Sequence, residues 1–218
     1  MYLQTYYNLL AEHRSDRADA MRAYMKNHFE FLGVAASQRK AVEKAFYKQY
    51  GLPKYEDLAD IVTEAWATDE REIQYFAMDL VERMRKQWQP DLLVLIEMMI
   101  VKKSWWDTVD FVASHLVGQY FERFPTEMVA KTTVWNTSDN MWLQRTSIIF
   151  QLFYKEKTDT SLLFAHINTH TESKEFFLQK AIGWALRQHA YTDAALVKDF
   201  VARTDLANLS RREALKRL

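Results

Sequence analysis

The sequence has no cysteine, only four glycines and three prolines among its 218 residues, and a formal net charge of zero. The lack of cysteine excludes disulfides and cysteine-ligated metals, and it fits a reducing cytoplasm. Parallel-sheet enzymes and β-sandwiches place many glycines and prolines in their turns, so the scarcity of both indicates a nearly all-helical chain. No glycine-rich phosphate loop is present, which excludes the common nucleotide-binding folds.

Long apolar runs are also missing. No stretch is apolar for long enough to cross a membrane, and the amphipathic residues 1–14 do not have the form of a secretory signal. The sequence therefore predicts a cytoplasmic protein with no membrane partner. With 49% hydrophobic and 27% charged residues, the chain can nevertheless bury a substantial core.

Charge is unevenly distributed along the chain. Residues 1–50 contain 8 Lys/Arg against 5 Asp/Glu, residues 51–100 contain 5 against 11, and residues 140–218 contain 12 against 8. Positive ends thus enclose an acidic middle. A curved protein could present one basic face built from both ends, as nucleic-acid binding requires, whereas an ordinary solvated surface explains the same asymmetry.

Apolar residues recur at helical spacing almost throughout the chain. The connections are short, so successive helices are expected to be antiparallel neighbours. Candidate N-caps are Ser37, Asp139, Ser173 and Ser210. The predicted helices cover residues 2–13, 16–27, 37–50, 55–67, 69–87, 90–102, 104–115, 117–124, 125–136, 139–156, 159–169, 173–190, 193–202 and 207–217.

An apolar–glutamine pair recurs inside long helices at Gln74, Gln144 and Gln179, with separations of 70 and 35 residues. A basic residue, Arg145 or Lys180, follows the last two pairs. The period predicts two-helix repeats stacked into an α-solenoid, in which matching positions gather on the concave face. Coincidence among amphipathic helices is the alternative.

The segment KSWWDTVD at residues 103–110 is the most unusual in the chain. Trp106 and Asp110 are four residues apart and share a helix face, whereas Trp105 is offset toward the core. An indole face beside a carboxylate on a concave surface can hold a cation. The competing interpretation is a core tryptophan next to a surface aspartate.

Later repeats add further candidates for the same surface. Arg145 could clamp a phosphate or form an inter-repeat salt bridge to an acid of the 101–110 helix. Gly183, in mid-helix beside Trp184, permits close approach of either a neighbouring helix or a ligand. Residues 210–214 (SRREA) could place a capped, basic helix start against a phosphate.

A metal site is not predicted. His166 and His170 are four residues apart on one helix, but no nearby acid or third histidine completes a ligand set.

Taken together, these segments resemble the AlkD family of bacterial DNA alkylation-repair glycosylases, which are built of HEAT-like repeats. The resemblance covers nearly the whole chain in order, and its strongest stretches are residues 23–29 (AYMKNHF), 103–110, 139–151, 173–187 and 209–214. It implies a single domain over residues 1–218, an α-α superhelix of HEAT-like repeats curved into a C, with DNA in the concavity.

The resemblance also implies an activity, which is hydrolysis of the N-glycosidic bond of cationic N3- and N7-alkylated purines in duplex DNA. A cationic base is already a good leaving group, so the task is to stabilise an oxocarbenium-like sugar and to place a water. The family is understood to grip the DNA backbone without a base-flipping pocket. No cofactor and no metal are implied, and a monomer is expected.

Residue roles follow from the resemblance position by position. Asp110 would stabilise the sugar cation and orient water, Trp106 and Trp184 would pack on the deoxyribose, and Arg145 would hold the backbone near the lesion. Candidate DNA contacts are Tyr24, Lys26, Lys180, Arg187, Arg211 and Arg212. The chain departs from a basic DNA-binding protein in its net charge of zero, which predicts weaker or more salt-sensitive binding. The rival hypothesis is a non-catalytic HEAT-repeat scaffold for DNA structures or a protein partner.

Overall fold

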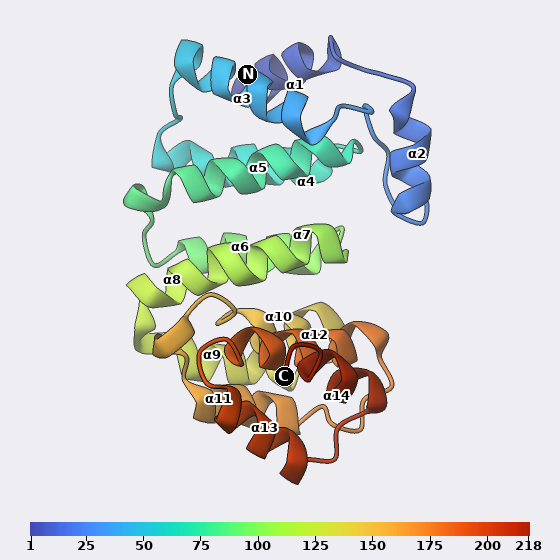
Figure 1. Cartoon of the computed structure of the whole chain (residues 1–218). Helices are drawn as coiled ribbons and strands as arrows, with labels where there is room; N and C mark the ends of the chain where they lie inside the picture. Colours follow the sequence, from blue (N-terminus) through green and yellow to red (C-terminus); the bar gives the residue numbers. More distant parts are fainter. The chain divides into compact units, whose positions relative to one another are not determined.

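The computed structural model describes all residues, 1–218, and its regular elements are helical throughout (Figure 1). The one β-type pairing is an isolated bridge between Glu30 and Glu70. The all-α prediction is therefore confirmed. The chain forms two compact units, Met1–Leu95 and Ile96–Leu218. The single domain and the C shape expected from the sequence stay predictions.

The first unit contains five helices and the start of a sixth, joined by two short 3-10 turns. These elements are α1 (Tyr2–Ala11), α2 (Arg17–Tyr24), α3 (Ala36–Tyr50), η1 (Tyr55–Asp57), α4 (Leu58–Ala67), α5 (Arg71–Arg83), η2 (Arg85–Gln87) and α6 (Leu92–Val101), the last of which continues into the second unit. An aromatic core holds the unit together: Tyr6 stacks on Phe76 at 3.7 Å between ring centroids, and Phe46 packs edge-on against both.

The second unit contains the remaining helices. They are α7 (Trp106–Phe111), the π-helical η3 (Val112–Val117), α8 (Gly118–Arg123), η4 (Pro125–Glu127), α9 (Met128–Asn136), α10 (Met141–Ile149), η5 (Lys155–Lys157), α11 (Thr160–Asn168), α12 (Phe176–His189), α13 (Ala194–Arg203) and α14 (Asn208–Ala214). A buried apolar cluster joins α10, α11, α12 and α13 through side chains such as Ile148, Leu163, Ile182 and Val197.

The helix starts reveal the repeat more clearly than the sequence does. The N-caps of α3, α5, α7, α10 and α12 are Ala35, Glu70, Trp105, Asn140 and Glu175, so each lies 35 residues after the one before. Since matching positions of successive repeats occupy matching places along these helices, the fifth residue after each N-cap forms one series. That series is Lys40, Tyr75, Asp110, Arg145 and Lys180.

The recurring glutamines have one structural task. The side-chain amides of Gln74, Gln144 and Gln179 each donate to the carbonyl of the residue six positions earlier, at 2.8, 2.6 and 2.8 Å. Each bond satisfies a carbonyl in the turn that leads into the helix, where no helical partner exists. This shared role is why the apolar–glutamine pair recurs, and it confirms the 35-residue repeat.

Several predicted helix boundaries were wrong, each for a local reason. Asn140 caps α10 by accepting from the N–H groups of Trp142 and Leu143, so Asp139 is not the cap. Ser173 lies two residues before the N-cap of α12 and accepts the N–H of Glu175 instead. The predicted helix 139–156 ends at Ile149, and a turn with Lys155 at φ 53° follows.

Other starts and joins also differ from expectation. α3 begins at Ala36 after the N-cap Ala35, so Ser37 lies inside the first turn. The break expected near residue 116 is a π-helical stretch that continues directly into α8. Gly118 permits this packing, because a Cβ there would lie 2.7 Å from the carbonyl oxygen of Phe150.

Helix α2 has no buried residue and stands beside the other helices of the first unit (Figure 1). The strand-like residues 30–34 that follow it are anchored by the buried carboxylate of Glu72. Its oxygens accept from the backbone N–H groups of Leu32, Gly33 and Val34 at 3.1, 3.0 and 3.1 Å. Because this carboxylate accepts from three buried N–H groups, it holds the segment that follows α2 in place.

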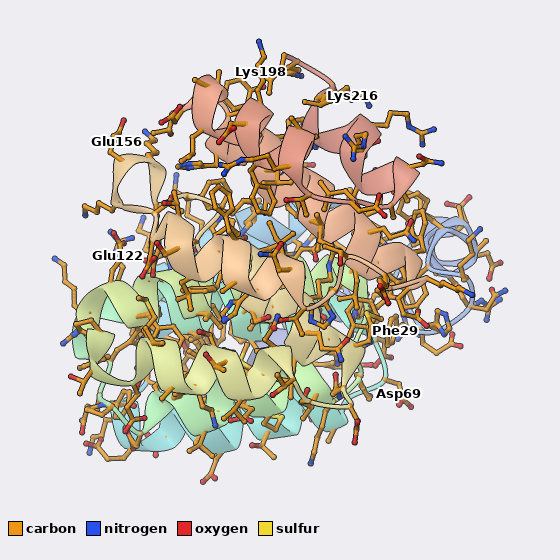
Figure 2. The ribbon with its side chains drawn as sticks, turned by 90° about the horizontal axis from the view of Figure 1, so that it is seen from below. Phe29, Asp69, Glu122, Glu156, Lys198 and Lys216 are labelled. Carbon is orange, nitrogen blue, oxygen red and sulfur yellow. The ribbon has the colours of Figure 1, made fainter.

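In the second unit, charged side chains extend outward at separate edges (Figure 2). Lys198 and Lys216 lie at the edge formed by α13 and the end of the chain, while Glu122 and Glu156 lie elsewhere on the rim. None of the helices combines the length and apolar character that crossing a bilayer requires.

Candidate active site

One cavity of the second unit, of about 290 Å³, brings together most of the predicted site residues. We call it the Asp110 pocket, and it is lined by Trp106, Asp110, Arg145, Phe176, Phe177, Lys180, Trp184 and Arg187. Trp106 and Trp184 are both partly exposed, as is Asp110. The interpretation of Trp106 as a core residue beside a surface aspartate is therefore wrong.

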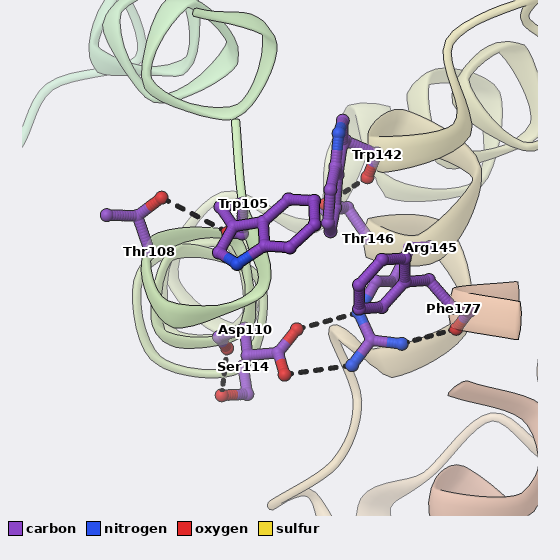
Figure 3. A network of polar contacts seen from close by, with 8 residues as sticks. All are labelled: Trp105, Thr108, Asp110, Ser114, Trp142, Arg145, Thr146 and Phe177. Atoms are coloured by element: carbon purple, nitrogen blue, oxygen red, sulfur yellow. Dashed lines mark hydrogen bonds and ion pairs between the residues drawn. The ribbon is translucent and has the colours of Figure 1, made fainter. Parts of the chain in front are cut away.

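Arg145 binds Asp110 through a two-pronged ion pair (Figure 3). Its Nε donates to Asp110 Oδ1 at 2.7 Å and its Nη2 to Oδ2 at 2.8 Å, while Nη1 donates to the carbonyl oxygen of Phe177. Arg145 is only 4% exposed, so its donors already have partners inside the protein. This is the inter-repeat salt bridge that the sequence left open, and in this arrangement the guanidinium does not face a phosphate.

Asp110 keeps capacity for a further ligand. A carboxylate has about four lone-pair directions, and the ion pair with Arg145 occupies one on each oxygen. The side chain of Asp110 is 20% exposed, toward the pocket that it lines. Arg145 thus fixes the orientation of the carboxylate and offsets its negative charge without covering it.

An aromatic cluster supports the ion pair from one side. The rings of Trp105, Trp142 and Phe177 meet at centroid distances of 5.8, 5.2 and 5.0 Å. Figure 3 shows Phe177 beside the guanidinium of Arg145, whose Cζ lies 5.9 Å from the ring centroid. Trp105 accordingly packs in this cluster and does not line the pocket, whereas Trp106 does.

Phe176 is a site residue that the sequence analysis missed. It lines the pocket with 58% of its surface exposed, so its ring is accessible to a ligand there. The 35-residue repeat could have identified Phe176 from the sequence. Phe176 and Trp106 are both the first residue of their helices and lie 70 residues, or two periods, apart.

Lys180 and Arg187 line the pocket and share one partner. The carboxylate oxygen Oε2 of Glu213 lies 2.6 Å from Arg187 Nη1 and 3.3 Å from Lys180 Nζ. The hydrogen bond from Arg187 is the largest cause that holds the pKa of Glu213 below its usual value. Glu213 therefore stays ionised at neutral pH.

Gly183 makes room for a helix rather than for a ligand. A Cβ on Gly183 would lie 2.5 Å from the Cβ of Glu213 and 2.9 Å from the carbonyl oxygen of Ser210. Both neighbours belong to α14, so the alternative of a neighbouring helix is the correct one. Ser210 is fully buried, donates to the carbonyl of Gln179, and lies inside α14, whose N-cap is Ala207. The prediction that Ser210 caps a phosphate-binding helix start is wrong.

The remaining candidates for DNA contact do not line the Asp110 pocket. Arg211 donates to the carbonyls of Val201 and Thr204, both at 3.0 Å, and so caps the end of α13. Its expected role toward DNA stays a prediction. Arg212 is exposed. In the first unit, Tyr24 is 67% exposed, and Lys26 is exposed at φ 57°.

The histidine pair has structural partners. His166 Nδ1 lies 2.9 Å from the carbonyl oxygen of Ser147, and His170 Nε2 lies 3.0 Å from that of Asn136. Burial lowers the pKa of both imidazoles. No group of three or more His, Cys, Asp or Glu side chains gathers in a way that could hold a metal ion.

Fold and pocket together define a helical-repeat protein in which helices of the second unit present an aromatic-lined carboxylate. The sequence signature of the DNA alkylation repair enzyme family matches residues 7–218, so the chain belongs to that family. No functionally curated protein shows significant similarity to it.

Solved structures agree with this assignment. A predicted DNA alkylation repair enzyme from Enterococcus faecalis is 32% identical, with a TM-score of 0.86 over 93% of this chain and 95% of that one. AlkD2 from Streptococcus mutans is 15% identical, with a TM-score of 0.65 over 92% and 99%. The protein smu.31 from the same species is 16% identical, with a TM-score of 0.62 over 83% and 97%. The two more distant relatives support the helical-repeat fold alone.

Proposed function

We propose that the protein is a DNA glycosylase that hydrolyses the N-glycosidic bond of cationic N3- and N7-alkylated purines in duplex DNA, acting as a monomer. The observation that carries the proposal is the Asp110 pocket, where one oriented carboxylate lies among the aromatic side chains of Trp106, Phe176 and Trp184. Membership of a family of DNA alkylation repair enzymes supports the choice of substrate.

The leaving group needs little activation by the protein. As the bond between C1′ and N9 of the alkylated purine breaks, its electron pair neutralises the positive base, so no general acid is needed. Positive charge then develops on the deoxyribose. Asp110 stabilises that charge and accepts a hydrogen bond from the water that adds to C1′, and the released proton passes to solvent. The faces of Trp106 and Trp184 pack against the sugar and favour its positive charge.

Arg145 has a role that differs from the backbone clamp suggested by the resemblance. With its Nε, Nη1 and Nη2 bound to Asp110 and Phe177, it acts on the substrate through the carboxylate. We assign Arg145 to orienting Asp110. The backbone contacts then fall to Lys180 and Arg187, which line the same pocket, with Tyr24, Lys26 and Arg212 as further candidates.

One observation favours the rival of a non-catalytic scaffold. The Asp110–Arg145 pair neutralises the carboxylate, as a purely structural bridge between repeats would do. Such a protein would bind duplex DNA or a protein partner without needing four aromatic side chains around an accessible carboxylate. The aromatic lining is therefore the reason that we place the glycosylase first.

The deciding experiment measures release of N7-methylguanine from methylated duplex DNA at low salt, by wild type, Asp110→Asn and Asp107→Asn. Asp107 lies in the same short helix but does not line the pocket, so its variant is a matched control for charge. We expect release by wild type and Asp107→Asn, and a loss of about a hundredfold or more in Asp110→Asn. DNA binding without release by wild type would leave the scaffold as the function.

A further inference from the structure

Glu213 is a charged residue that adjoins the Asp110 pocket without lining it. It lies on the last helix, α14, and is 8% exposed. Its Oε2 accepts from Arg187 and from Lys180, at 2.6 and 3.3 Å, so one carboxylate holds both cations of the pocket wall on α12. The shared acceptor makes the position of each cation depend on the other.

The two cations flank a proposed catalytic side chain. Lys180, Trp184 and Arg187 are separated by four and three residues along α12, so they share one face of the helix. All three line the pocket. By tying Lys180 to Arg187, Glu213 fixes a positive group on each side of the indole of Trp184.

The backbone that carries Glu213 is itself firmly placed. α14 packs so closely on α12 that only glycine fits at position 183, where a Cβ would lie 2.5 Å from the Cβ of Glu213. Ser210, one turn earlier in α14, donates to the carbonyl of Gln179 at 3.0 Å. The carboxylate is thus presented to α12 from a rigid element, as a positioning group requires.

We propose that Glu213 is a positioning residue that holds Lys180 and Arg187 beside Trp184 and restricts the positive charge that they offer to undamaged DNA. With Glu213 ionised, the three residues carry a net charge of about +1 rather than +2. Untethered lysine and arginine side chains would be free to reach phosphates in many orientations, which favours non-specific binding over one productive geometry. The catalytic part of this inference rests on the proposed function.

The test separates catalysis from binding in the variant Glu213→Gln, which keeps the shape of the side chain and removes its charge. Under single-turnover conditions with saturating enzyme, we expect the rate constant for N7-methylguanine release to fall about tenfold, because the cations lose their fixed geometry. Binding to undamaged duplex should become more salt-dependent, with the slope of log K against log salt concentration steeper by about 1, since a freed cation reaches one more phosphate. A merely structural role would not steepen this slope.

Asp199→Asn is the matched control. Asp199 pairs with Arg203 on α13 at the exposed surface, with 55% of its side chain accessible, and its variant makes the same change in net charge. We expect wild-type excision and a wild-type salt slope. An equal steepening in Asp199→Asn would overturn the proposal, because net charge alone would then explain the effect.

A second variant covers the case in which Glu213→Gln does not fold. Glu213→Asp keeps the charge but withdraws the carboxylate by one methylene group, so we expect slower excision with a wild-type salt slope. The proposal is overturned if Glu213→Gln shows wild-type excision and a wild-type salt slope. If Glu213→Gln does not fold, wild-type excision in Glu213→Asp overturns it. If wild type releases no base, the proposed function fails, and the salt slopes alone decide the role of Glu213.

Discussion

The two units each contain a charged cavity, and the two cavities differ in their aromatic content. The cavity of the first unit, of about 430 Å³, is lined only by Lys40, Glu43, Asp79, Glu82, Arg83, Arg85 and Lys86. The Asp110 pocket of the second unit, of about 290 Å³, combines charged side chains with Trp106, Phe176, Phe177 and Trp184. Charge is common to both cavities, and aromatic surface is found in one.

Both cavities use the same position of the repeat. Lys40 in the first unit and Asp110, Arg145 and Lys180 in the second are each the fifth residue after an N-cap. In the first unit, Arg39 and Lys40 pair with Glu43 and Asp79 in a closed network. In the second, the carboxylate of Asp110 remains 20% exposed beside indole faces. One register position therefore contributes to an ion-pair network in the first unit and to the Asp110 pocket, the proposed reactive site, in the second.

The largest expected effect is on stability and belongs to the first unit. Glu72→Gln keeps one acceptor oxygen but turns an NH₂ group toward the buried N–H of Leu32, since Glu72 now accepts from three N–H groups. We expect the free energy of unfolding to fall by about 3 kcal/mol. Denaturant unfolding measures the change, and hydrogen exchange should show faster opening of residues 32–34. Glu64→Gln, on an exposed position of α4, is the control and should behave as wild type. Equal stability of the two variants would show that the carboxylate does not anchor the segment.

Two matched variants, one in each cavity, test the difference between the cavities most directly. Asp79→Asn removes an acceptor 2.6 Å from both Arg39 and Lys40, and Asp110→Asn removes the partner of Arg145. Both should lower the free energy of unfolding, by about 2 kcal/mol each, because each leaves a buried arginine under-compensated. Excision per folded molecule should fall about a hundredfold in Asp110→Asn alone. If both variants lose excision equally, the Asp79 network is not purely structural, and the contrast between the two cavities fails.

The pH dependence of stability should have opposite signs in the two units. Burial raises the pKa of Glu43 to about 7, so the folded first unit binds more protons than its unfolded chain between about pH 4.5 and 7. Its contribution to stability is fully present below that window and is lost as the pH rises through it. In the second unit, burial lowers the pKa of His166, His170 and His189. That contribution is fully present above about pH 6.5 and is lost as the pH falls.

Hydrogen exchange measured from pH 5 to pH 8, corrected for its intrinsic rate, resolves the two trends within one molecule. Protection of α3 and α5 should decline with rising pH, and protection of α11 and α12 should decline with falling pH. Glu43→Gln should weaken the first trend, to which the raised pKa of buried Glu72 also contributes, and should leave the second unchanged. Parallel trends in both units would contradict the assignment to these buried groups.

Sequence reasoning predicted the fold further than it predicted the site. Two local signals predicted the repeat correctly: the helical periodicity and the series Gln74, Gln144 and Gln179. The structure confirms the series because each glutamine makes the same hydrogen bond in its turn. Spacing placed Trp106 on the face of Asp110. The pairing of Asp110 with Arg145 depends on packing between helices, so spacing could only leave it as an alternative.

Two other features were beyond any local pattern. The reason for Gly183 lies in the backbone of α14, which approaches from 27 or more residues away in sequence. The exposure of Phe176 contradicts its apolar chemistry, which predicts burial. It becomes interpretable only when the repeat register aligns it with Trp106.

The smallest expected effect is on DNA binding by a Phe176 variant, which tests what the exposed aromatic surface of the pocket contributes to affinity. An exposed ring on the pocket wall can pack against a base or sugar of DNA, a contact worth about 1 kcal/mol or somewhat more. We expect Phe176→Ala to weaken binding to duplex DNA about fivefold, with an unchanged salt slope because no charge is altered. Phe153→Ala removes a ring that is 50% exposed outside the pocket and serves as the matched control. If both variants bind as wild type does, the aromatic lining acts on the sugar cation alone, and Trp106 and Trp184 suffice for it.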